Sequence, residues 1–300
     1  MKSNKKFVNK PLIFWGNVRF LSESLGYSID ANTKLGIEGK AKTYTYDECI
    51  NAYKKAGLNF DPDLVSDIIE YLNYRADLIN NHIKHRLMKL EEAKELYTQV
   101  YESLYDSSSF KCDLPLNKQT GDKKGPNYFT CIINILTESA IRKYYEENNI
   151  DIPDDHLFNS NPQNLTYFTD NDNNVLHMLS RRFDGAYPST TNPLAIWEIK
   201  EYYYTTTFGS RIADGVYETQ LDGFEINQIE TTFKEILPTI KHYYLIDAYY
   251  TWFTKGKSYL CRIVDMLHMG LVDDVLFGKE VVEEWSTIIT NLLEQQHSIL

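Results

Sequence analysis

The chain has 300 residues, of which 43% are hydrophobic and 24% charged, with a formal net charge of −11. This length and apolar content allow a sizeable core in one large domain or two ordinary ones, and they exclude global disorder. The acidic balance argues against tight non-specific binding to nucleic acid. Basic residues nevertheless cluster at Lys118, Lys123 and Lys124 and again at Arg181 and Arg182.

No run of about 18 apolar residues is present, so we expect no membrane span. The apolar stretch after the basic N-terminus is too short for a secretory signal, which makes a cytoplasmic protein the expectation. The four cysteines are widely scattered and form no C-x-x-C pair, so we expect four free buried thiols. His82 and His85 are interpreted as part of a solvated helix face, and His268 as a core histidine.

The first hundred or so residues are expected to be mainly helical. Thr45 lies three residues before Glu48, as in a capping box, and predicts a helix over residues 45–55. Apolar residues at helical spacing predict a second helix over 63–75 and a long amphipathic helix from 76 to 104. We interpret the long helix as a packing element rather than a dimerising one.

Turn-rich segments at residues 107–109 and 116–127 indicate a seam or a mobile loop. We therefore expect a helical N-terminal region over residues 1–109, serving recognition or dimerisation, and an α/β domain over residues 110–300.

The second region alternates between helical and strand-like patterns. The expected elements, in chain order, are a helix at 128–148, strands at 175–187 and 194–204, a helix at 211–229 capped by Ser210, a strand at 241–253, and a strand followed by a helix within 260–276. This order predicts a mixed α/β sheet with helices on both faces.

The residues with the clearest chemistry are Asp184 and the triplet Glu198-Ile199-Lys200. Side chains alternate along a strand, so Glu198 and Lys200 point to one face and Trp197 to the other. Two carboxylates suit Mg²⁺, which also keeps water and substrate oxygens, and Mn²⁺ can substitute for it. A lysine beside the same phosphate would orient or deprotonate the attacking water or stabilise developing charge, as phosphodiester hydrolysis requires.

Asp184 with Glu198-x-Lys200 resembles the PD-(D/E)xK nuclease signature found in most type II restriction endonucleases, although Phe183 stands where that family often has proline. The resemblance implies a restriction-endonuclease-like mixed sheet flanked by helices, with Asp184, Glu198 and Lys200 as catalytic residues. It further implies Glu138, on the preceding helix, as a metal ligand beside Asp184 and Glu198. The implied protein is a Mg²⁺-dependent restriction endonuclease that cleaves double-stranded DNA as a homodimer.

Two other functions stay open. One is a phage-defence or repair nuclease of low sequence specificity, and the other is a non-catalytic nucleic-acid-binding or scaffold protein whose strand charges are surface features. No G-x-x-x-x-G-K-[ST] motif is present, so we expect no nucleotide cofactor. The sequence does not identify the residues that would read DNA bases.

Overall fold

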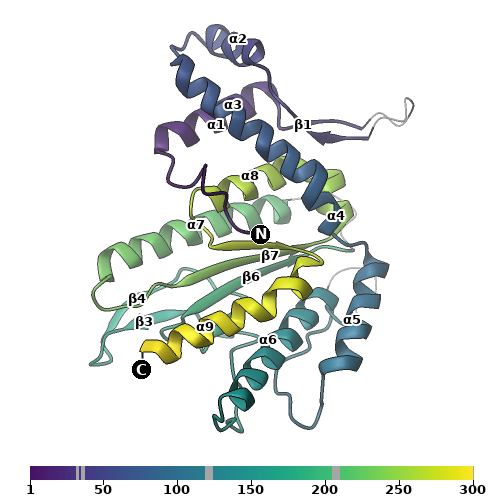
Figure 1. Ribbon diagram of the computed structural model, residues 1–300, viewed down its shortest axis with the longest axis vertical. Helices are drawn as coiled ribbons and strands as arrows, with labels where there is room; N and C mark the ends of the chain where they lie inside the picture. The colour runs from purple at the N-terminus through teal and green to yellow at the C-terminus, as the bar shows by residue number, and fades with distance from the viewer. Residues whose placement is uncertain (32–33, 35–37, 119–123, 205–209, 300) are drawn as a thin grey trace.

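The computed structural model describes residues 1–31, 34, 38–118, 124–204 and 210–299 (Figure 1). Its central sheet has the strand order β5-β6-β7-β8. β5 (Gly185–Tyr187) pairs antiparallel with β6 (Ala195–Glu201), whereas β7 (Lys241–Asp247) and β8 (Asp274–Phe277) continue the sheet in parallel. Parallel neighbours need a crossover connection. Here α7 (Ser210–Phe233) joins β6 to β7, and α8 (Lys257–His268) joins β7 to β8.

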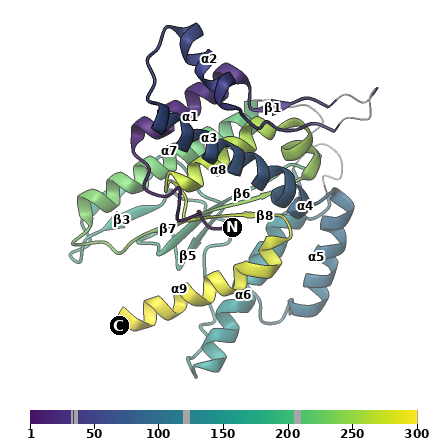
Figure 2. The same ribbon diagram turned by 45° about the horizontal axis from the view of Figure 1, so that its top comes forward.

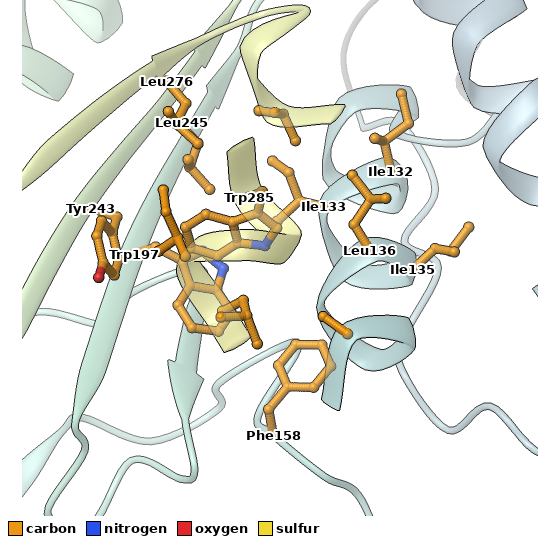
Figure 3. Close-up of a cluster of buried hydrophobic side chains, with 14 of the residues drawn as sticks. Ile132, Ile133, Ile135, Leu136, Phe158, Trp197, Tyr243, Leu245, Leu276 and Trp285 are labelled. Carbon is orange, nitrogen blue, oxygen red and sulfur yellow. The ribbon is translucent and has the colours of Figure 1, made fainter. Parts of the chain in front are cut away.

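Helices cover both faces of this sheet, with α7 and α8 on one side and α6 (Tyr128–Glu147) and α9 (Ser286–Ile299) on the other (Figures 1 and 2). Alternation along β6 explains the division. Trp197 packs with α6 and α9, at 5.4 Å between ring centroids from Trp285 (Figure 3), while Ile196 packs with residues of α7. The predicted mixed α/β sheet with helices on both faces is confirmed.

The N-terminal helices have a core of their own. α1 (Leu12–Leu25), α2 (Tyr46–Ala56) and α3 (Pro62–Asp77) surround buried aromatic and aliphatic side chains, and a small hairpin of β1 (Ser28–Ile29) and β2 (Lys40–Ala41) extends beside them. The predicted capping box of α2 is confirmed: Thr45 Oγ1 accepts from the Glu48 amide at 3.4 Å, and Glu48 accepts from the Thr45 amide at 3.1 Å.

A buried ion pair joins this region to the sheet domain. Arg75 of α3 donates to Asp265 of α8 at 2.8 Å and to the Ser22 hydroxyl of α1 at 2.9 Å. Tyr71 also donates to Asp265, at 2.7 Å. His268 of α8 bonds the Val264 carbonyl through Nδ1, so it is the core histidine that the sequence indicated.

The predicted continuous helix over 76–104 is wrong. The helical path runs through η2 (Leu78–Ile83) and α4 (Lys84–Arg86), turns extended at Leu87, and restarts as α5 (Leu90–Leu104). The Met88 amide donates to Asp247 Oδ1 at 2.7 Å, and its carbonyl accepts from Tyr249 at 2.8 Å. These bonds to the end of β7 replace helical bonds, so tertiary contacts override the local periodicity.

Other elements differ in extent from the prediction. The strand expected at 175–187 divides into β4 (Val175–Met178), which forms a hairpin with β3 (Tyr167–Thr169), and β5. Within 260–276 the helix precedes the strand, the reverse of the expected order, because the buried residues of α8 recur at helical spacing. The helix α9 and the short segments η3 (Tyr250–Lys255) and η4 (Val281–Trp285) were not anticipated.

The helices expected at 128–148 and 211–229 correspond to α6 and α7. Lys123 and the capping side chain of Ser210 lie outside the described residues. All four cysteines are buried and free, as predicted. Among the helices that the structure describes, none is long and apolar enough to cross a membrane.

Candidate functional site

Strand pairing brings Asp184 and Glu198 together. In the antiparallel β5–β6 register, Gly185 lies opposite Trp197, so Asp184 lies opposite Glu198. The Asp184 amide donates to the Trp197 carbonyl at 3.1 Å, and Asp184 Oδ2 accepts from the Ile199 amide at 2.8 Å. The first carboxylate is thereby held at the mouth of the hairpin, beside the second.

Gly185 makes this close approach possible. A Cβ added at Gly185 would lie 2.1 Å from Trp197 Cε2, well inside any tolerable contact. The indole therefore packs directly on the backbone next to Asp184. A larger residue at position 185 would have to displace either the ring or the strand.

Glu198 and Lys200 lie on the same face of β6, as strand alternation predicted. Lys200 Nζ bonds Glu198 Oε1, and it also lies 3.9 Å from Glu218 of α7. The Glu198 residue is 3% exposed, and the Lys200 side chain 13%. Most of the surface of this pair is buried, with Glu218 of α7 beside Lys200.

Arg181 forms the other half of an ion-pair network. Its Nη2 lies 2.7 Å from Glu198 Oε2, while its Nε donates to both oxygens of Asp222 at 3.1 and 2.9 Å. Asp222 is buried within α7 and holds Arg181. Residue spacing gives no signal for a partner on another element.

The environment shifts the pKa values of these groups. Desolvation by the surrounding protein, and then the Glu198 charge, raise the pKa of Asp184 to about 7. Burial alone would lower the pKa of Lys200, but the Glu198 carboxylate outweighs it and holds that pKa above its usual value. Lys200 is therefore cationic at neutral pH.

Asp184, Glu198 and Lys200 line one open cavity of about 880 Å³. Its wall also includes Arg181 and Arg182, the polar segment 160–163 and the first turn of α6. Asp184 is exposed at this cavity. A ligand with several anionic oxygens could reach the two carboxylates, the lysine and both arginines at once.

Glu138 is not brought to this cavity. Its carboxylate accepts from the amides of Lys111 and Cys112, at 2.9 and 2.6 Å, and pairs with Arg142 at 2.7 Å. Those partners anchor the segment that precedes α6. The acid that does line the cavity besides Asp184 and Glu198 is Glu201, which accepts from the Thr130 amide at 2.9 Å in the first turn of α6.

In the part of the chain that the structure describes, no group of three or more His, Cys, Asp or Glu side chains is arranged to hold a metal ion. A set of two carboxylates nevertheless fits Mg²⁺, which usually takes one or two protein carboxylates and fills its octahedron with water and phosphate oxygens.

Two family models match the chain. One, described as a domain of unknown function (DUF7687), covers residues 88–292 and thus the whole sheet with α5 to α8. The chain belongs to the DUF7687 family. The other model, a domain of unknown function (DUF7690), covers residues 1–82. No curated protein matches the chain, and no solved structure does.

The two matches meet between residues 82 and 88, whereas the turn-rich sequence suggested a boundary at 109–110. The DUF7687 region therefore begins at the helix break of Met88 and includes α5. That helix packs on α6, with 5.6 Å between the ring centroids of Tyr97 and Tyr128. All the cavity residues named above belong to the DUF7687 region.

Proposed function

We propose that this protein is a Mg²⁺-dependent endonuclease of the PD-(D/E)xK type, which hydrolyses phosphodiester bonds of double-stranded DNA. The observation that carries the proposal is the convergence of Asp184, Glu198 and Lys200 on one open cavity. The order α6, β5, β6, α7, β7, with an antiparallel pair followed by a parallel crossover, also supports it, because the resemblance implies a mixed sheet of this kind.

Asp184 and Glu198 would hold the ion, and we leave Glu138 out of the proposed ion site because it does not line the cavity. When bound, a divalent ion supplies an activated water and neutralises charge at phosphorus. Lys200 stays protonated beside Glu198, so we assign it to the phosphate oxygens rather than to proton abstraction.

In the reaction, the oxygen of water gives up a proton and forms a bond to phosphorus, the bond from phosphorus to the leaving deoxyribose oxygen breaks, and that oxygen takes up a proton. Negative charge grows on the phosphate oxygens as the bonds exchange. The ammonium of Lys200, fixed by Glu198 and flanked by α7, would stabilise that charge without reorganising.

The test is cleavage of plasmid DNA with Mg²⁺ or Mn²⁺ by the full chain and by the variants Glu198→Gln and Lys200→Ala. Removing a group that stabilises charge only in the transition state typically costs about 100-fold or more in kcat. Glu147→Gln, on the exposed end of α6, serves as the control. Wild-type cleavage rates in both site variants would contradict the assignment.

The cleavage pattern separates the specific from the non-specific enzyme. Discrete bands would support a type II restriction endonuclease, and a smear would support a low-specificity phage-defence or repair nuclease. A restriction enzyme that reads two-fold sites is expected to act as a homodimer, which sedimentation at working concentration would test.

The competing explanation is a non-catalytic protein in which Glu198 only ties Arg181 and Lys200 together. Two observations weigh against a purely structural role: Lys200 and Arg181 both line the open cavity, and Asp184 lies opposite Glu198. Absence of any cleavage with either metal ion on all DNA tested would favour the scaffold instead.

A further inference from the structure

Both oxygens of Glu198 already have a cationic partner. Lys200 takes Oε1 from the same strand, and Arg181 takes Oε2 from the segment that leads into β5. The Glu198 residue is 3% exposed, so neither partner is replaced by bulk water. An ion that binds Glu198 must therefore compete with a protein cation.

Of the two cations that contact Glu198, Arg181 is the one better suited to be replaced by a metal ion. Its contact with Glu198 is close, at 2.7 Å, but Arg181 Nη2 and Glu198 Oε2 both lack a hydrogen bond of good geometry. The bond from Nε to Asp222, by contrast, reaches both carboxylate oxygens. Asp222 therefore holds the guanidinium through hydrogen bonds from Nε. The Nη2 edge is attracted to Glu198 by charge, without a well-directed hydrogen bond.

Arg181 also lines the cavity beside Asp184 and Glu198. A guanidinium presents several N–H donors in one plane and matches the oxygens of a phosphate. With Nε retained by Asp222, the edge released from Glu198 would still lie at the site where the phosphate is expected.

We infer that Arg181 is an internal competitor for the metal ion: it neutralises Glu198 in the ion-free protein and is released to the phosphate once the ion binds. This inference rests on the proposed function. It makes Arg181 a further residue of the site, and it makes Asp222 the residue that positions it.

The test is Mn²⁺ binding to the full chain, measured by calorimetry in the absence of DNA. Arg181→Gln removes the competing charge and keeps a hydrogen-bonding side chain, so Mn²⁺ should bind at least about tenfold more tightly than to the wild type. Lys143→Gln removes one positive charge from an exposed position of α6 outside the cavity, and screening should limit its effect to about threefold. Glu198→Gln should abolish Mn²⁺ binding, both as a single substitution and when combined with Arg181→Gln.

Arg181→Gln should also lower kcat on DNA despite the tighter ion, because the phosphate loses its guanidinium. If this variant does not fold by circular dichroism, Arg181→Gln combined with Asp222→Asn, which removes the orphaned carboxylate as well, takes its place.

The outcomes separate the two proposals. If wild-type protein binds Mn²⁺ through Glu198 and the Arg181 variant binds equally or more weakly, the competition is overturned while the proposed nuclease stands. If no variant binds Mn²⁺, or if Glu198→Gln leaves the binding intact, both proposals fail.

Discussion

The aliphatic stem of Lys200 runs across the helix backbone at Gly215: a Cβ added there would lie 2.9 Å from Lys200 Cε and 3.4 Å from Cδ. Glycine within a helix destabilises it by roughly 0.5–1 kcal/mol relative to alanine. The space left above Gly215 is occupied by the lysine of the candidate site, so α7 and β6 pack as closely as that side chain allows.

Gly215→Ala is accordingly expected to separate activity from stability. The new methyl group should push the ammonium of Lys200 away from Glu198 and lower kcat at least about tenfold, because small misplacements of a positioned group cost catalysis. The gain in helix propensity should offset part of the crowding, leaving the melting temperature nearly unchanged. Gly16→Ala in α1, where the added methyl meets nothing within 4 Å, is the matched control for cleavage and for thermal unfolding.

Gly185→Ala should act on stability first. Its methyl group would overlap the buried Trp197 ring, and overpacking of this kind costs about 1–3 kcal/mol. Urea unfolding measures the loss, again against Gly16→Ala. Adding Trp197→Leu to Gly185→Ala should recover part of it, and additive effects of the two substitutions would refute the direct clash.

Breaking the Arg75–Asp265 pair should loosen the N-terminal helices from the sheet domain. Asp265→Ala leaves Arg75, which is 1% exposed, without its carboxylate, and such a loss typically costs about 3–5 kcal/mol. The exposed pair of Lys143 and Glu147 provides the comparison, since Glu147→Gln should cost less than about 1 kcal/mol. Equal losses of unfolding free energy in Asp265→Ala and Glu147→Gln would contradict the larger contribution expected of the Arg75–Asp265 pair.

Glu201 should make stability depend on pH. Desolvation raises its pKa from 4.5 to about 8, against the lowering effect of the Thr130 amide. Between these values the folded protein binds more protons than the unfolded chain, so the free energy of unfolding falls as pH rises through that window. Glu201→Gln removes this titration and should gain stability relative to the wild type from pH 5 to pH 9. A constant difference in unfolding free energy across that range would contradict the shift.

The sequence predicted those features that depend on short spacing. Alternation along β6 was enough to separate Glu198 and Lys200 from Trp197, and the Thr45-to-Glu48 interval was enough to start α2. Both follow from the period of a single element.

The sequence did not predict features that depend on contacts between elements far apart in the chain. The helix break at Met88 arises because Asp247 and Tyr249, far along the chain, bind its backbone. Similarly, Glu138 has the residue type of a metal ligand, but amides of the preceding segment occupy it. Asp222 became a partner of Arg181 only through the packing of α7 on the sheet.

The burial of tryptophan has a practical consequence. The chain contains four tryptophans. Trp15 lies in the core of the N-terminal helices, Trp252 lies between the sheet and α8, and Trp197 and Trp285 share the opposite face of the sheet. All four are shielded from water, so the native protein should fluoresce at short wavelength and shift to the red on unfolding. Replacing Trp15 with Phe would leave the emission of Trp197, Trp252 and Trp285, and comparison with the full signal would reveal whether the core of the N-terminal helices melts in the same transition.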